Sequence, residues 1–256
     1  MTDAARIRDV LQRLAGRYGP LGWWPGESSF EIITGAILTQ RTAWTNVQIA
    51  LANLKAAGAL SPAAMRALPD DELAALIRPS GFYRGKVRKL RAFLDLLFER
   101  FGGDLDLMLA TPAEDLRPLL LATHGIGPET ADAVLLYAAR HPRFVIDAYT
   151  RRAFSRIGIR PERDTYDAWQ RLFEDAVPPD VAAYAEYHAL VIVHGKDVCR
   201  TRPRCAECVL GDVCETGLRR HQVAGDDGVV RDAAADDEEV EHLVVAEDAW
   251  ERVRSA

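Results

Sequence analysis

The sequence of 256 residues lacks any apolar run near the length of about 20 residues that a membrane-spanning helix needs. Its first ten residues, MTDAARIRDV, mix charged with apolar side chains and lack the apolar core of a signal peptide. We therefore expect a cytoplasmic protein without a membrane partner. The sequence also lacks a fixed-period repeat and has little β pattern, because its only plausible strand, 144–146, is too short to build a sheet.

The chain lacks an excess of positive charge, since 38 acidic residues outnumber 32 lysines and arginines and the formal net charge is −6 at pH 7. The deficit lies in the segment from His221 to the end, whose eleven acidic and three basic residues carry −8, so that residues 1–220 carry +2. Charge alone does not suggest a nucleic-acid partner, but a mildly basic body does not exclude one. We expect residues 216–256 to form an acidic, mostly disordered tail.

Cysteine is almost absent, and all four cysteines lie within sixteen residues, in the pattern C-x5-C-x2-C-x5-C. Such crowding in a cytosolic chain indicates a metal centre rather than disulfides. Four thiolates in one short loop, 199–214, suit a 4Fe–4S cluster. A structural zinc ion is the alternative. Most structural zinc sites, however, pair two short C-x2-4-C motifs, and only one such motif is present here. The predicted ligands are Cys199, Cys205, Cys208 and Cys214.

Helix signals dominate the rest of the chain. Apolar residues recur at helical spacing from Ile7 to Leu14. Capping patterns predict helix starts at Ser28-x-x-Glu31, Ser61-Pro62 and Thr111-Pro112. The predicted fold class is all-α.

The stretch 119–139, LLLATHGIGPETADAVLLYAA, predicts a helix–hairpin–helix. One helix ends at Gly125-Ile126-Gly127 and the next begins at Pro128. Two glycines around one apolar residue permit a tight turn with positive φ, and they let backbone amides approach a DNA phosphate. A glycine-capped helix corner without a ligand is the alternative.

Asp147 follows the run Phe-Val-Ile about twenty residues after the hairpin. A carboxylate there could stabilise the positive charge that grows on a deoxyribose during glycosidic cleavage and orient the attacking water. An aspartate after an apolar run is also a common helix N-cap, and the two roles are compatible.

The order of hairpin, aspartate and cysteine loop resembles the endonuclease III superfamily of helix–hairpin–helix DNA glycosylases over about residues 5–215. The resemblance implies that Asp147 is the catalytic aspartate and that the loop holds a 4Fe–4S cluster, although its first gap has five residues rather than the six of endonuclease III. Bifunctional members have a lysine in the hairpin that forms a Schiff base with the sugar. Here that position is Glu129, so the resemblance implies a monofunctional enzyme that uses water.

Several stretches are closer to the 3-methyladenine DNA glycosylase III branch, which also has glutamate in the hairpin. In that branch the position of Trp24 stacks on the extruded base, and a cationic alkylated purine suits an indole face. Gln40 resembles the residue that fills the duplex gap after base flipping. The alternatives are a Trp pair buried as core and an ordinary residue at a helix end. Some members of the branch lack the cluster, whereas this chain has all four cysteines, so it differs from those members. The matching stretches are WWP (23–25), FE (30–31), AILTQRT (36–42), RPSGFY (78–83), GPETADAVLLYA (127–138) and HGK (194–196).

We expect two helical subdomains around a cleft: 27–140, which ends in the hairpin, and 1–26 with 141–215, which holds the cysteine loop. The expected function is hydrolysis of damaged bases, such as 3-methyladenine, from double-stranded DNA by a monomer. One alternative is an endonuclease III-like glycosylase and AP lyase for oxidised pyrimidines. The other is a non-catalytic DNA-binding module, which would be favoured if Asp147 were buried, capped and turned from the cleft.

Overall fold

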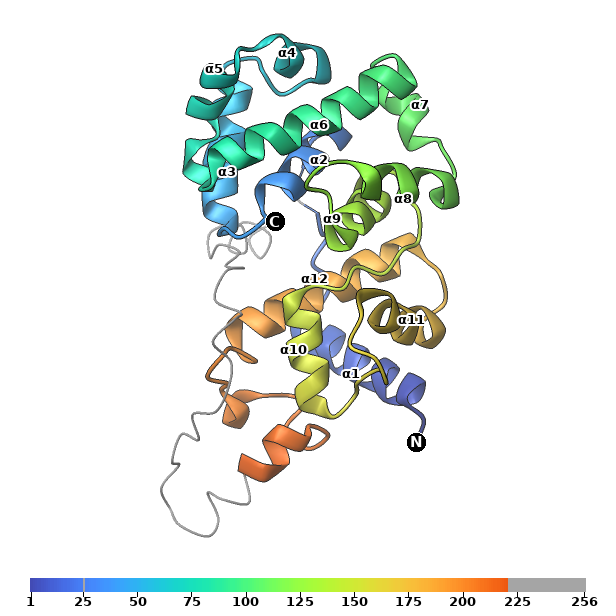
Figure 1. The fold of residues 1–256 in the computed structure, drawn as a ribbon. Coiled ribbons are helices and arrows are strands. Elements are labelled where there is room, and N and C mark those ends of the chain that lie inside the picture. Colours follow the sequence, from blue (N-terminus) through green and yellow to red (C-terminus); the bar gives the residue numbers. More distant parts are fainter. Residues whose placement is uncertain (25, 221–256) are drawn as a thin grey trace. The chain divides into compact units, whose positions relative to one another are not determined.

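The computed structural model describes residues 1–24 and 26–220, and within them it contains helices joined by short loops and no strand (Figure 1). The all-α class is therefore confirmed, and residues 144–146 form an extended connection instead of the strand that their sequence suggested. No helix in these residues is long and apolar enough to cross a membrane. The expectation of a disordered acidic tail lies, from residue 221 on, outside the described residues.

The chain divides into two compact units. The first contains Met1–Trp23 and the described residues from Ile146 onward, and the second contains Trp24–Val145. We call them the cysteine unit and the hairpin unit. Their boundaries lie three and five residues from the expected positions after 26 and 140.

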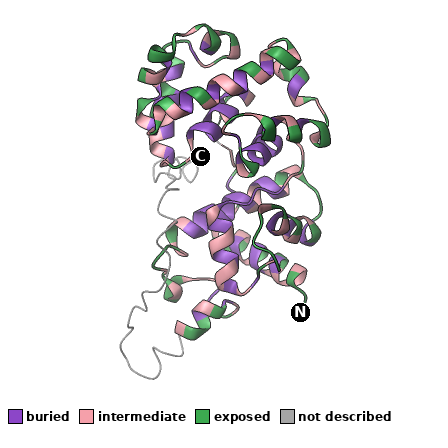
Figure 2. Ribbon diagram, in the orientation of Figure 1, coloured by how far each residue is buried: buried purple, intermediate pink, exposed green. Residues whose placement is uncertain are grey.

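The hairpin unit is built around α2 (Ser29–Leu38), which buries eight of its ten residues and so forms the centre of the core. This helix packs against α3, α6, α9 and η2. Figure 2 shows the longer helices of this unit with buried faces turned inward and exposed faces outward. The other elements are α3 (Trp44–Ala56), α4 (Pro62–Ala67), α5 (Asp70–Leu76), the 3-10 turn η1 (Arg78–Ser80), α6 (Tyr83–Phe101), α7 (Leu105–Leu109), α8 (Ala113–Ala122), α9 (Pro128–Ala133) and the π-helical η2 (Val134–Ala138).

Local capping explains where some of these helices begin. Ser28 accepts a hydrogen bond from the backbone N–H of Glu31 at 3.2 Å, and Ser61 caps α4 in the same way, so both predicted starts are confirmed. The predicted cap at Thr111 is wrong. Its hydroxyl donates instead to the carbonyl of Leu107 at 3.2 Å, and α8 begins after Pro112 without a side-chain cap.

The cysteine unit contains α1 (Asp3–Tyr18), α10 (Ala148–Ile157), α11 (Tyr166–Ala176), α12 (Val181–Asp197) and the 3-10 turn η3 (Cys205–Glu207). Helix α12 packs against α1 and α10, and α1 also packs against α11. The apolar positions of α1 that the sequence spacing singled out are buried, as the periodicity predicted. Helix α10 touches both candidate sites of this unit, because the candidate catalytic carboxylate lies at its start and the cysteine loop contacts its end.

Candidate DNA interface, carboxylate and cysteine centre

The helix–hairpin–helix forms between α8 and α9. Ile126 is buried, and Gly125 has a φ of 80°, which favours glycine. A Cβ at Gly125 would also overlap the Lys89 side chain, so glycine permits a close approach there. Gly127 has a φ of −89°, so Gly125 alone of the two hairpin glycines supplies the positive φ that the expected tight turn allows. It is exposed, and a Cβ there would meet only open space.

Gln40 lies two residues beyond the end of α2 and contacts the hairpin. Its amide nitrogen donates to the carbonyl of Gly125 at 3.0 Å and to the hydroxyl of Thr130 at 2.9 Å. Its amide oxygen accepts a hydrogen bond from the ammonium group of Lys89. These contacts hold the hairpin against the end of α2. Insertion of Gln40 into a duplex, the role that the resemblance implies, would require all three to break.

Two lysines of α6 lie near this contact and differ in their surroundings. Lys86 is buried and donates to the backbone carbonyls of Leu38 and Ser80, and burial lowers its pKa to about 8. Lys89 is half-buried, and its pKa is lowered by burial and by the nearby charge of Arg41. Lys86 therefore joins α2 to the turn before α6, whereas Lys89 presents a positive charge beside the hairpin.

Arg41 and Phe82 were not identified from the sequence. Both have positive φ, 56° and 45°, a conformation that costs non-glycine residues free energy and that clusters at functional positions. The Phe82 ring is 65% exposed, and the guanidinium of Arg41 lies 5.2 Å from its centroid. Both residues fall in stretches that carry the family resemblance, 36–42 and 78–83, but nothing in the sequence pairs them, because neither residue type favours positive φ and the two are 41 positions apart.

Trp24 belongs to an aromatic cluster. Its ring lies edge-on to Trp44, with centroids 5.1 Å apart, and tilted against Tyr137, also at 5.1 Å. Trp44 and Tyr137 are buried, but Trp24 is only half-buried and can offer part of its surface to another ring. Tyr137 lies on the π-helical η2, a distortion that is frequent at functional sites.

The two acidic residues of α9 have different environments. Glu129 is half-buried in the first turn of α9, at the position that the resemblance equates with the hairpin lysine of bifunctional enzymes. Asp132 is fully buried and forms a two-pronged ion pair with Arg117 of α8, at 2.8 and 3.1 Å. The guanidinium of Arg143 lies 3.9 Å from the same carboxylate. Asp132 therefore fixes α9 against α8 and the following segment.

Asp147 is the N-cap of α10, and one carboxylate oxygen accepts from the backbone N–H of Thr150 at 2.7 Å. The other oxygen lies 3.5 Å from Nε2 of His188 on α12. Asp147 is 3% exposed. Burial acts to raise its pKa, but His188 and the Thr150 amide outweigh that effect and hold the pKa below its usual value. The carboxylate is therefore both a cap and a buried, persistent negative charge.

The four cysteines line one cavity of about 380 Å³, a volume that includes its open mouth. Helix α12 leads into Cys199, and η3 carries Cys205. Burial raises the pKa of the Cys208 thiol to about 11, so a metal that binds its thiolate must displace a proton. Among residues 1–24 and 26–220, no three side chains of His, Cys, Asp or Glu converge closely enough to hold a single metal ion.

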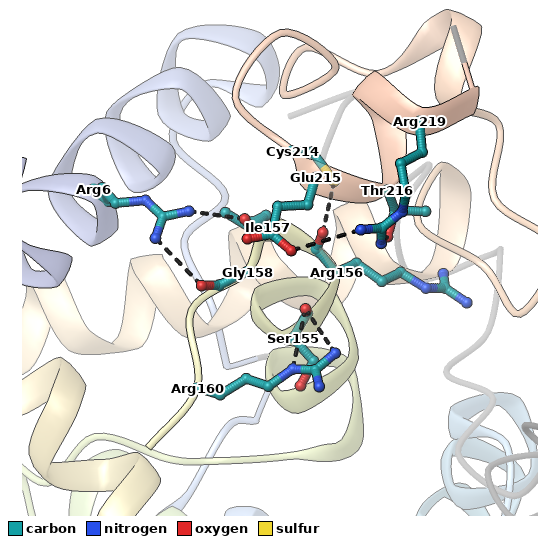
Figure 3. A network of polar contacts seen from close by, with 10 residues as sticks. All are labelled: Arg6, Ser155, Arg156, Ile157, Gly158, Arg160, Cys214, Glu215, Thr216 and Arg219. Carbon is teal, nitrogen blue, oxygen red and sulfur yellow. Dashed lines mark hydrogen bonds and ion pairs between the residues drawn. The ribbon is translucent and has the colours of Figure 1, made fainter. Parts of the chain in front are cut away.

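The end of α10 anchors the cysteine loop (Figure 3). Arg152 donates to the carbonyls of Gly195 and Cys199, both at 2.8 Å. The Cys214 thiol donates to the carbonyl of Arg156 at 3.2 Å. On the other side, Arg6 of α1 donates to the carbonyl of Ile157 at 2.9 Å. One helix thus connects the Asp147 carboxylate to the cysteine cavity.

A profile of the HhH-GPD superfamily of base excision DNA repair proteins matches residues 34–179. The protein MJ1434 of Methanocaldococcus jannaschii, provisionally named a DNA repair glycosylase, is 40% identical over 210 residues, which are 81% of this chain and 95% of that protein. The crystal structure of a 3-methyladenine DNA glycosylase of H. pylori, bound to 1,N6-ethenoadenine, matches with a TM-score of 0.65 and 27% identity. The match covers 77% of this chain and 98% of the H. pylori chain.

The fold also matches an endonuclease III trapped as a covalent intermediate with DNA, with a TM-score of 0.74, 22% identity and coverage of 86% of this chain and all of that chain. Helices, hairpin and cysteine loop thus occur together, in one order, in a chain that a repair-protein profile matches over more than half its length. The chain belongs to the HhH-GPD superfamily of base excision DNA repair proteins.

Proposed function

We propose that this DNA repair glycosylase is a monofunctional enzyme that hydrolyses the N-glycosidic bond of alkylated purines, such as 3-methyladenine, in double-stranded DNA. The proposal rests on the environment and ionisation of Asp147. It is buried, its pKa is held low, and helix capping and His188 fix it in place. A fixed negative charge of this kind stabilises the positive charge that develops on the deoxyribose as the bond to the base breaks.

In the proposed reaction, the carboxylate of Asp147 faces the sugar and orients the water that attacks C1′. The bond between C1′ and the base nitrogen breaks, its electron pair leaves with the base, and the water that adds to C1′ releases one proton to the solvent. A purine nucleotide alkylated at N3, such as 3-methyladenine, is already cationic, so its base departs as a neutral molecule with little need for an acid. His188 acts on this step only through Asp147.

Trp24 supports the choice of base class. Its half-buried indole is held at a fixed angle by Trp44 and Tyr137, which lowers the entropic cost of stacking against an extruded ring. An indole face attracts cations, and 3-methyladenine is cationic while it is bonded to the deoxyribose. The H. pylori relative is itself named a 3-methyladenine DNA glycosylase.

Glu129 supports a reaction without strand cleavage. A Schiff base requires an amine that attacks C1′, and a carboxylate cannot form one. Lyase activity would therefore have to use an amine at another position. The proposed product is an intact strand that contains an abasic site.

We further propose that Cys199, Cys205, Cys208 and Cys214 hold a 4Fe–4S cluster. Their thiols surround one cavity, whereas a single zinc ion would need all four sulfurs about 2.3 Å from one point. When bound, the cluster would supply four covalent anchors and a one-electron redox centre. Arg152 and Arg156 hold the backbone of the loop around the cavity.

The proposed partner is duplex DNA, bound by one protein monomer. The hairpin and the positive charges of Lys89 and Arg41 would contact phosphates, and the exposed Phe82 ring offers an apolar surface to the bases. Gln40 would remain beside the hairpin unless DNA displaces it from Gly125 and Thr130.

One panel of duplexes, each with a single lesion, tests the proposal. Released free base is measured by mass spectrometry, and binding is measured on the same duplexes. The proposal predicts release of 3-methyladenine above oxidised pyrimidines and undamaged bases. Release of oxidised pyrimidines alone would favour the endonuclease III-like alternative. Binding without release of any base would favour a DNA-binding module, an alternative that is compatible with the burial and capping of Asp147.

A further inference from the structure

His194 lies between a cysteine and a tyrosine and takes no part in the proposed base release. It is 1% exposed on the last turns of α12 and lines the cysteine cavity. Its Nε2 lies 3.6 Å from the sulfur of Cys208, within hydrogen-bond reach for sulfur. Its Nδ1 lies 3.0 Å from the hydroxyl of Tyr18, the last residue of α1. Both ring nitrogens therefore have a partner, one from α1 and the other from the cysteine loop.

We propose that Tyr18 and His194 form a hydrogen-bond relay to the Cys208 ligand that raises the reduction potential of the bound cluster. The inference rests on the proposed 4Fe–4S cluster. A thiolate bound to iron has no proton and can only accept a hydrogen bond. The imidazole nitrogen that faces it must then carry the ring proton, so the proton lies on Nε2.

Tyr18, on the other side of the imidazole ring, favours the same tautomer with the proton on Nε2. When Nε2 carries the proton, Nδ1 is an acceptor, and the phenol hydroxyl of Tyr18 can donate to it. The opposite tautomer would turn a lone pair of Nε2 toward the thiolate. Partners of this kind orient the ligand sphere and tune the potential of metal centres.

The direction of the effect is set by charge. Reduction adds one negative charge to the cluster, and part of that charge resides on the cysteine sulfurs. A donor to Cys208 stabilises the reduced form more than the oxidised form and so raises the potential. Burial of His194 excludes water that could replace the bond. Arg156, whose guanidinium lies 3.5 Å from the sulfur of Cys199, acts in the same direction but is independent of the relay.

The relay can be removed in steps. His194→Phe deletes the donor, and His194→Gln keeps an N–H group that can reach the sulfur. Tyr18→Phe removes only the hydroxyl that selects the tautomer. The matched control is Tyr184→Phe, which removes a phenol hydroxyl from a buried tyrosine of α12 that bonds the Val177 carbonyl and does not line the cavity.

The experiment uses the full chain without DNA and has three measurements. Iron content and the broad absorbance near roughly 400 nm report whether the cluster is bound. Voltammetry reports the potential, and resonance Raman spectra in H₂O and D₂O report exchangeable hydrogen bonds to the cluster sulfurs.

His194→Phe should lower the potential. At a fixed ambient potential, the ratio of reduced to oxidised cluster should fall about tenfold, which corresponds to about 59 mV for one electron. Part of the deuterium shift of the Fe–S bands should disappear. Tyr18→Phe should give a smaller shift in the same direction, His194→Gln should restore part of the parental potential, and Tyr184→Phe should leave it unchanged.

An unchanged potential in His194→Phe with parental iron content would overturn the relay. If His194→Phe fails to retain iron, the test relies on Tyr18→Phe instead. A reduction potential and a Raman spectrum equal to those of the parent in Tyr18→Phe would then overturn the proposal. A parent protein without iron would instead overturn the proposed cluster, so the two failures are distinguishable.

Discussion

The hairpin unit and the cysteine unit present different chemistry to a nucleic acid. In the hairpin unit the candidate groups are mostly neutral or part of the backbone: the glycine turn, the amide of Gln40 and the rings around Trp24. In the cysteine unit they are ionisable and lie at the two ends of one helix, because Asp147 caps the start of α10 and the cysteine loop contacts its end.

This difference suggests that the hairpin unit recognises the DNA and the cysteine unit supplies the catalytic charge. A mostly neutral surface with a few positive side chains can bind DNA phosphates and stack on an extruded base. Such contacts depend on the shape of the DNA and on the rings of the base, and little on the base sequence. A buried carboxylate fixed by capping suits a reaction in which positive charge appears on a sugar. Changes in the cysteine unit should therefore affect the chemical step, and changes in the hairpin unit should affect recognition.

The largest expected effect is that of Asp147→Asn. Because the amide keeps the shape but removes the charge, base release should fall about 100-fold to 1000-fold, the size of effect seen when one electrostatic contact to a transition state is lost. Binding to abasic DNA should change little. Single-turnover release and equilibrium binding measure the two effects.

Asp180→Asn is the matched control, since Asp180 caps α12 with a bond of 2.7 Å to the N–H of Ala183 and is exposed. It alters a cap in the same unit without removing the candidate catalytic charge. If Asp147→Asn released bases at the rate of the parent protein, Asp147 would be only a helix cap. That result would contradict a catalytic role of the cysteine unit.

Trp24→Ala should have the next largest effect, on recognition of the base. Stacking on a base is worth about 1–3 kcal/mol, so release of alkylated bases should fall roughly tenfold to a hundredfold. Binding to abasic DNA, which has no base to stack, should be nearly unchanged, and Trp24→Phe should retain most of the release. An equal loss of release and of abasic binding would assign Trp24 a packing role.

Lys89→Ala should have a smaller effect, confined to binding. If the ammonium group contacts one phosphate, affinity should fall several-fold at low salt, and the slope of log K against log salt should become shallower by about one. Lys55→Ala is the control, because Lys55 lies on α3 of the same unit and pairs with Glu27 and Glu31. Identical slopes for the parent and Lys89→Ala would exclude the phosphate contact.

The smallest expected effect is on stability in acid. The fold holds the pKa of Asp147 below its usual value of 3.8, so its ionised form stabilises the native state above that pH. This contribution is lost as the pH falls through the lowered native pKa. The difference in unfolding free energy between the parent and Asp147→Asn should therefore be larger at pH 7 than in strong acid. A difference that stays constant with pH would contradict the lowered pKa.

Local signals in the sequence predicted local structure well. The caps at Ser28 and Ser61 and the turn at Gly125 depend on neighbouring residues only, and the structure confirms them. Thr111 failed as a cap because its hydroxyl bonds the preceding helix, an alternative that the capping pattern does not reveal. Of the two glycines that permit the tight turn, only Gly125 has a positive φ, and the pattern did not indicate which of them would.

Contacts between distant residues could not be predicted. Lys89 is 49 residues from Gln40, and His188 is 41 residues from Asp147. These pairs depend on how whole helices pack, and a single sequence contains no periodic or spacing signal for them. The types of chemical group at the candidate site were thus predictable, but the partners that tune them were not.

The proposed reaction of this glycosylase is hydrolytic release of a base that leaves the strand intact. The most direct measurement tracks one lesion duplex in a single turnover, with each time point divided between neutral and alkaline treatment and a parallel reaction containing borohydride. We predict strand breaks only after alkali and no covalent enzyme–DNA adduct, because Glu129 has no amine. Efficient trapping and nicking without alkali would contradict the proposal, and loss of trapping in Lys89→Ala or Lys196→Ala would then identify the amine.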